Sequence, residues 1–154
     1  MQGFAADSLD ALATRVGEEL AVSDWLPITQ DRVNRFAEVT GDLQWIHIDE
    51  ARARRESPYG TTIAHGYLTL SLLPGLSQGC IEVRGTRMAV NYGLNRVRFM
   101  APVRVGDRIR ARFTLQACEA LPGGGAQVVW QATVDVEGSD KPACVAEMVS
   151  RRYP

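Results

Sequence analysis

Cysteine is scarce in this sequence, with three residues in a chain of 154. Cys80, Cys118 and Cys144 lie far apart, have no neighbouring histidine, and do not match the ligand spacing of a metal site. An odd number of cysteines without a disulfide framework is typical of reduced thiols in the cytoplasm. We therefore interpret all three as small core or strand residues and expect a cytoplasmic protein.

The sequence also lacks a long apolar run and an excess of charge. No stretch approaches the roughly 20 apolar residues that cross a bilayer, and the start, with Asp7 and Asp10, does not resemble a secretory signal. The formal net charge of −1 gives no electrostatic reason to expect nucleic acid as a partner. With 45% apolar and 23% charged residues, the chain is expected to form one soluble globular domain over residues 1–154.

The first half of the sequence carries apolar residues at helical spacing. One stretch has leucines around most of its circumference, which indicates a buried helix, and Pro74 with Gly75 predicts a kink or an early end there. Residues 1–28 are expected to form an N-terminal helical extension. The predicted helices cover residues 8–20, 30–39, 48–56 and 65–80.

The second half alternates apolar and polar residues, as half-buried strands do. A turn at 105–107 and a glycine-rich turn at 121–125 separate the strands, which suggests a series of hairpins in an antiparallel sheet. Helices followed by antiparallel strands indicate an α+β domain, with the sheet wrapped around the apolar helix. The predicted strands cover residues 88–99, 108–119, 126–137 and 143–152.

The stretch from Phe36 to His47 carries the first candidate for chemistry. Gly41 suits a sharp turn, and it places Asp42 five positions before His47 on an irregular loop. Such a pair is able to hold one water between a carboxylate and an imidazole, as general acid–base catalysis requires. The alternative is structural: Asp42 caps the turn, and His47 makes a backbone hydrogen bond in a half-buried loop.

A second motif, Ile63-Ala64-His65-Gly66, opens the apolar helix. Free backbone N–H groups at a helix start favour a developing negative charge, and Gly66 has no side chain to keep a ligand away. The alternative is that Gly66 allows close packing where the helix enters the core, and that His65 is structural.

Taken together, the two motifs resemble the MaoC-like dehydratase family, the (R)-specific enoyl-CoA hydratases of the hot-dog fold. The family motif has an aromatic residue, Thr/Ser-Gly-Asp, a short spacer and His, and Phe36, Thr40, Asp42 and His47 fall in register with it. The continuation Gln44-Trp45-Ile46-His47 differs from the more usual Asn-Pro-aliphatic-His and is similar to the nodulation protein N-like subgroup, as is the segment 91–99. The resemblance runs from about Val16 to the last strand.

This resemblance implies a role for each candidate residue. Asp42 and His47 would hold the water that adds to C3 of a trans-2-enoyl-CoA, and the product would be an (R)-3-hydroxyacyl-CoA. The Gly66 N–H would bind the thioester oxygen, with Ile63 and His65 beside it in the substrate-binding segment and His65 mainly structural. No metal and no redox cofactor are implied.

The resemblance also implies a homodimer whose two sheets join, with acyl-CoA running between the subunits. Asn95, Arg98 and two arginine clusters are candidates to meet the CoA phosphates, although such clusters are usually solvated faces. A Ser that orients the catalytic Asp in some members falls here on Pro74, and Ser71 is a candidate replacement. The clusters comprise Arg52, Arg54 and Arg55, and Arg104, Arg108, Arg110 and Arg112.

Two other functions compete with the hydratase. A non-catalytic acyl-thioester-binding or partner subunit of the same fold is the main alternative, and the presence of both Asp42 and His47 argues against it. A thioesterase would usually place a carboxylate on the central helix, but residues 65–79 contain neither Asp nor Glu. Fold alone does not separate these functions, so the site residues must decide.

Overall fold

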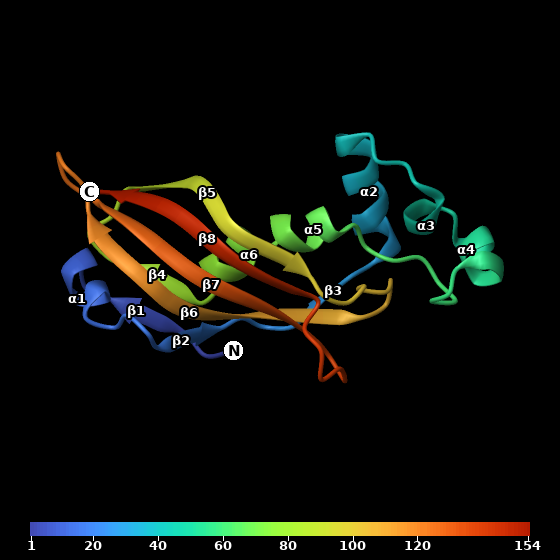
Figure 1. Cartoon of the computed structure of the whole chain (residues 1–154), viewed down its shortest axis with the longest axis horizontal. Helices are drawn as coiled ribbons and strands as arrows, with labels where there is room; N and C mark the ends of the chain where they lie inside the picture. The colour runs from blue at the N-terminus through green and yellow to red at the C-terminus, as the bar shows by residue number, and fades with distance from the viewer.

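The computed structural model describes residues 1–154 throughout. Its main element is an antiparallel sheet that curves around two short helices (Figure 1). The strands lie in the order β2-β6-β7-β8-β5, with the short β3 also paired to β6. They are β2 (Glu19–Val22), β3 (Leu26–Pro27), β5 (Met88–Phe99), β6 (Arg108–Ala120), β7 (Ala126–Val136) and β8 (Cys144–Tyr153).

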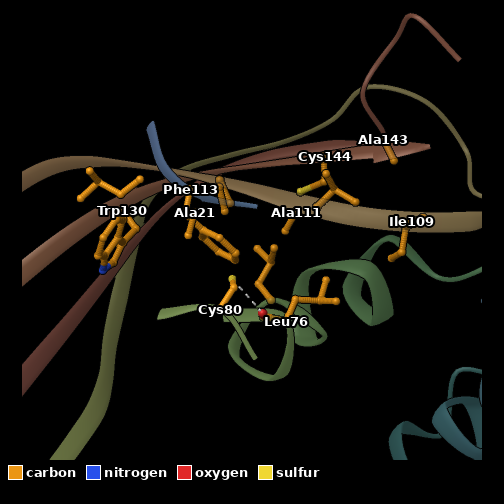
Figure 2. Packing of buried hydrophobic residues seen from close by; sticks show 14 of the residues in the cluster. Ala21, Leu76, Cys80, Ile109, Ala111, Phe113, Trp130, Ala143 and Cys144 are labelled. Atoms are coloured by element: carbon orange, nitrogen blue, oxygen red, sulfur yellow. Dashed lines mark hydrogen bonds between the residues drawn. The ribbon is translucent and has the colours of Figure 1, made fainter. Parts of the chain in front are cut away.

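The four long strands match the four predicted from alternation. Along β7, every second residue from Ala126 to Val136 is buried, so one face of the strand points into the core. These inward residues pack with helix residues such as Leu76, and Figure 2 shows Phe113 and Ala111 of the sheet facing Leu76 and Cys80. The period-2 pattern therefore predicted both the strands and their buried face.

The strand pairing corrects one expectation, because the first two long strands do not form a hairpin. β5 pairs with β8, from Met88 opposite Tyr153 to Phe99 opposite Cys144, and β6 pairs with β7. The segment after Phe99 thus crosses from one edge of the sheet to the other side of β7. As a result, the 12-residue β5 is an edge strand.

The central helix is interrupted, as Pro74 predicted. It consists of α5 (Gly66–Ser71) and α6 (Leu73–Gln78), and Pro74 lies in the first turn of α6. Proline is tolerated there because the first N–H groups of a helix have no intrahelical partner. Leu73 and Leu76 are buried against the sheet, so the α+β prediction of a sheet around an apolar helix is confirmed.

The predicted helical extension over residues 1–28 is wrong in its detail. Only α1 (Leu9–Ala13) is helical, and Gly17, with a φ of 95°, stops any continuation to Leu20. Leu20 lies instead in β2, where it is buried, and β1 (Phe4–Ala6) pairs in parallel with β4 (Ile81–Val83). The leucines that suggested one helix therefore belong to a helix, α1, and a strand, β2.

Three further helices form a segment beyond the start of α5, at one end of the sheet (Figure 1). They are α2 (Gln30–Thr40), α3 (Trp45–Ile48) and α4 (Glu50–Glu56), and the first and last agree with the predicted helices. None of the helices combines the length and apolar character needed to cross a bilayer. This helical segment carries Asp42 and His47 to the start of the central helix.

Candidate active site

The end of α2 sets the position of Asp42. The helix stops at Gly41, which adopts the left-handed conformation with φ 76° and donates its N–H to the Ala37 carbonyl. The next residue, Asp42, receives its backbone orientation from this turn, and its N–H donates to the Thr40 hydroxyl at 3.4 Å. The Asp42 side chain is exposed, so its carboxylate is open to solvent and ligand.

His47 is buried, and its hydrogen bond defines its tautomer. It lies in α3 with 7% of its surface exposed, and its Nδ1 is 2.7 Å from the Ile63 carbonyl. Because a carbonyl only accepts, Nδ1 carries the proton and Nε2 of the neutral ring keeps its lone pair. Burial lowers the pKa of His47, so the ring is neutral at pH 7 and Nε2 is available as a base.

His65 joins the loop to the central helix. It is 2% exposed, its Nε2 donates to the Asp42 carbonyl at 3.0 Å, and its ring stacks on His47 with centroids 3.7 Å apart. One ligand atom from each of Asp42, His47 and His65 lies within 4.8 Å of the others, a set that is able to hold a water or a metal ion. His65, for which the family resemblance implied a mainly structural role, thus holds the backbone of Asp42 in place.

Gly66 is the first residue of α5, where helical N–H groups have no intrahelical partner. The ring of Phe99, at the end of β5, covers it: a Cβ on Gly66 would lie 3.0 to 3.2 Å from three ring carbons. Phe99 also contacts the Tyr67 ring edge-on, with centroids 5.8 Å apart. Close packing therefore favours glycine at this position, because a side chain would require the Phe99 ring to shift.

Ile63 acts through its backbone, since its carbonyl accepts from His47 and its N–H donates to the Ile46 carbonyl. Asn95 and Arg98 lie elsewhere, on the exposed edge strand β5, and no hydrogen bond or ion pair joins them to Asp42, His47 or Gly66. Within one chain, the structure therefore brings together five of the seven candidate residues.

The arginine clusters are largely neutralised by their own carboxylates, as a solvated face would be. Arg110 and Arg112 both bond Asp135, and Arg108 bonds Glu137. In the other cluster, Arg52, Arg54 and Arg55 pair with glutamates of α4. This pairing weakens the expectation that these clusters bind CoA phosphates.

Sequence reasoning missed the polar clamp that holds α3. The Gln30 side chain donates to the His47 carbonyl at 2.7 Å and accepts from the Thr62 hydroxyl, which is buried. No motif marks Gln30, because its partners lie 17 and 32 positions away in the sequence. Ser71, the expected replacement for the family Ser, donates instead to the Tyr67 carbonyl within its own helix.

Comparison with known proteins identifies the family. The MaoC like domain matches residues 11–137. The chain is 53% identical to 3-hydroxyacyl-thioester dehydratase Z of Mycobacterium tuberculosis over 94% of this chain and 95% of that one. It is 42% identical to Nodulation protein N of Rhizobium leguminosarum bv. viciae over 93% of this chain and 89% of that one. A solved R-hydratase from Pseudomonas aeruginosa has a TM-score of 0.71 at 22% identity, covering 96% of this chain and 86% of that one.

Proposed function

The chain belongs to the MaoC-like dehydratase family of the hot-dog fold, and we propose that it is an (R)-specific enoyl-CoA hydratase. At the coarser level, it is a hydratase or dehydratase of 3-hydroxyacyl thioesters. The finer proposal is that it adds water reversibly to trans-2-enoyl-CoA and gives the (R)-3-hydroxyacyl-CoA. In this proposal Asp42 and His47 activate the water without a metal ion, and no redox cofactor is needed because hydration changes no oxidation state overall.

One observation carries the proposal: a ring nitrogen of His47, whose Nε2 keeps a free lone pair, lies within 4.8 Å of an Asp42 carboxylate oxygen. One water that makes two hydrogen bonds of about 2.8 Å is able to bridge such a pair. As the water oxygen bonds to C3, His47 Nε2 takes its proton, and the acid–base pair returns a proton to C2. The Asp42 carboxylate accepts a hydrogen bond from the other O–H of the water and so orients its oxygen.

Charge that develops on the thioester oxygen needs a donor, and Gly66 is the proposed one. Its N–H is at the start of α5, one residue after His65, which also fixes Asp42. A preorganised backbone donor at such a position stabilises an enolate-like oxygen without reorganisation.

The test is hydration of crotonyl-CoA, followed as loss of the enoyl-thioester absorbance. Asp42→Asn and His47→Gln should each lower kcat/KM on the order of a hundredfold or more, because each removes a proton-handling group. Glu38→Gln is the matched control, since Glu38 is exposed on α2 and makes no side-chain hydrogen bond or ion pair, and it should retain activity. Chelator treatment should leave the rate unchanged.

Stereochemistry is tested with the product. An NAD-linked dehydrogenase specific for (S)-3-hydroxyacyl-CoA should fail to oxidise it, whereas an (R)-specific one should oxidise it. If wild type binds short, medium and long enoyl-CoAs but turns over none, the protein is instead a non-catalytic acyl-thioester-binding subunit. Full activity in Asp42→Asn would contradict the assignment of this residue.

A second part of the proposal is a homodimer joined along β5. This edge strand has one row of unpaired backbone groups and exposes Met88, Val90, Tyr92 and Leu94 at 43 to 58%. A long, exposed, apolar edge is a template for pairing with another chain. Pairing of two β5 strands would also bring Asn95 and Arg98 to the interface, close to where a CoA would run in such a dimer.

A further inference from the structure

A cavity of about 440 Å³ lies between the central helices and the inner face of the sheet. Its lining begins at Leu70, one helical turn beyond Gly66, and continues along α6 to Gln78. The opposite wall comes from β5, β7 and β8. The volume is in the range of about 300–1,000 Å³ that small-molecule sites occupy. None of Asp42, His47 and His65 lines it, so the cavity adds a separate compartment to the proposed site.

The cavity wall becomes polar toward the end of β8. Inward positions of this strand begin with the core residues Cys144 and Ala146 and continue with Met148, Ser150 and Arg152. The neighbouring strand places Asn91 opposite Ser150, and Gln78 lines the same cavity from the helix side. An alkyl chain would gain nothing from these groups, because polar atoms that face hydrocarbon lose their hydrogen bonds.

Two hydrogen-bond donors in this wall have no partner. Trp130 is 5% exposed, and its Nε1 is buried without a hydrogen bond. Figure 2 shows its indole standing off the sheet with the nitrogen at its far end. The Nε of Arg152 is likewise buried without a hydrogen bond, and the residue takes part in no ion pair. Burial lowers the pKa of its guanidinium.

Arg151 shows that this isolation is specific to Arg152. The side chain of Arg151 donates to Gln127 at 3.3 Å and stacks on Tyr92, with its guanidinium 3.6 Å from the ring centroid. Arg152 is partly buried without a counter-charge, which is unfavourable, and its buried Nε without an acceptor adds a cost of about 1–3 kcal/mol. An anionic acceptor in the cavity would relieve both.

We propose that this cavity binds the distal end of an acyl chain that terminates in a carboxylate. The substrate class is then an enoyl thioester of a dicarboxylic acid, with its far carboxylate on Arg152 and the indole N–H of Trp130. The inference rests on the proposed function, because the thioester must be held at Gly66 for the chain to run along α5 and α6. A carboxylate is favoured over a neutral group because Arg152 carries an unpaired charge.

The test compares kcat/KM for trans-2-enedioyl-CoAs with that for trans-2-monoenoyl-CoAs of the same length, over short, medium and long chains. At the length that reaches Arg152, wild type should prefer the dicarboxylic substrate. Arg152→Met should lower the dicarboxylic-to-monocarboxylic ratio on the order of tenfold to a hundredfold, as expected for a lost charge-assisted hydrogen bond. Trp130→Phe should lower it less, and the matched control Arg151→Met should leave it unchanged.

The outcomes separate this inference from the proposed function. If wild type does not hydrate crotonyl-CoA, the proposed function fails; if it does, but prefers the monocarboxylic substrate at every length, only the carboxylate site fails. The carboxylate site also fails if Arg152→Met leaves the dicarboxylic-to-monocarboxylic ratio of kcat/KM unchanged, whether or not the oligomeric state changes. Arg152→Lys keeps the charge and should retain part of the preference for the dicarboxylic substrate. If Arg152→Met does not fold, Arg152→Lys and Trp130→Phe still test the site.

Discussion

At the scale of single residues, the burial of His47 has a consequence for pH. Burial is the main cause of the lowered pKa of His47, and the hydrogen bond to Ile63 and the nearby Asp42 act in the opposite direction. The base is active when neutral, so activity is full above this pKa and is lost as the pH falls through it. We expect the acidic limb of kcat/KM against pH to lie below about 6.5, the ordinary histidine value.

Asp42→Asn tests the assignment of that limb. Removing the carboxylate removes a charge that raises the pKa of His47, so the limb of the residual activity should move to lower pH. A pH–rate profile of both proteins with crotonyl-CoA is the measurement. A limb that stays in place in Asp42→Asn, or that lies above 6.5 in wild type, would mean that His47 is not the titrating base.

Gly66 gives a second prediction for single residues. In Gly66→Ala, the new methyl group would meet the Phe99 ring at 3.0 Å, so either the ring or the helix start must shift. We expect kcat/KM to fall about 10- to 100-fold, less than or equal to the loss of a whole oxyanion donor. Phe99→Leu in the same chain should restore part of the loss, because it removes the obstructing ring.

The matched control for Gly66→Ala is Gly75→Ala. Gly75 lies in α6 with no atom near the position of a new Cβ, so alanine there should leave activity intact and add up to about 1 kcal/mol of stability. Steady-state kinetics and thermal melts of wild type and the three variants are the measurements. If Gly66→Ala is as active as wild type, neither the packing against Phe99 nor access to the N–H requires the absence of a side chain at this position.

The same residues show what the sequence could and could not predict about the site. Asp42 and His47 were found because one turn places an acid and an imidazole near each other, and Gly66 because a helix starts there. Gln30 and Phe99 were not, because their partners are brought to them only by tertiary folding. The tautomer of His47 likewise depends on Ile63, 16 positions away.

At the scale of elements, the end of α2 is the feature that positions Asp42. Gly41→Ala introduces no clash, but a non-glycine residue at φ 76° costs about 1–2 kcal/mol. We expect a Tm lower by about 2–8 °C and a lower kcat, because the turn that orients Asp42 is strained. Asn tolerates this conformation better, so Gly41→Asn should lose less of both.

Gly138→Ala separates strain from catalysis. Gly138 has φ 75° and open space at its Cβ position, in the turn between β7 and β8. Its substitution should lower the Tm by a similar amount and leave kcat unchanged. If the two alanine variants lose activity equally, the effect of Gly41→Ala comes from stability alone. Thermal melts and crotonyl-CoA kinetics on the three variants distinguish these cases.

Elements differ in how well the sequence predicts them, for a physical reason. The long strands were predicted to within a residue or two at each end, because alternation reports directly on one buried face. The first helix was extended too far because Leu12 and Leu20 are buried and Leu9 packs against the same core, although they lie in two different elements. The pairing of β5 with β8 was missed because nearness in sequence favours a hairpin with β6.

At the scale of the whole molecule, the proposed homodimer depends on the edge strand β5. The strand is 12 residues long with register shifts at Asn91/Gly93 and Leu94/Arg96, and an edge of this length is normally shielded by charge, proline or a covering element. Here its exposed apolar residues, Val90 and Leu94 among them, have no cover within the chain. The proposed cover is the β5 of a second copy, which would extend both sheets into one.

Val90→Glu tests this assembly in solution. The new carboxylate would lose its water among the apolar residues of the proposed edge contact, so the variant should sediment as a monomer near 16.9 kDa whereas wild type sediments at twice that mass. Val16→Glu is the matched control, because Val16 is exposed to a similar degree, 48% against 43%, but lies outside β5. This control variant should remain dimeric.

A wild type that is monomeric at micromolar concentration would contradict the proposed dimer, and a Val90→Glu variant that stays dimeric would place the interface elsewhere. If the dimer is lost together with crotonyl-CoA turnover while the fold is kept, the second subunit completes the site.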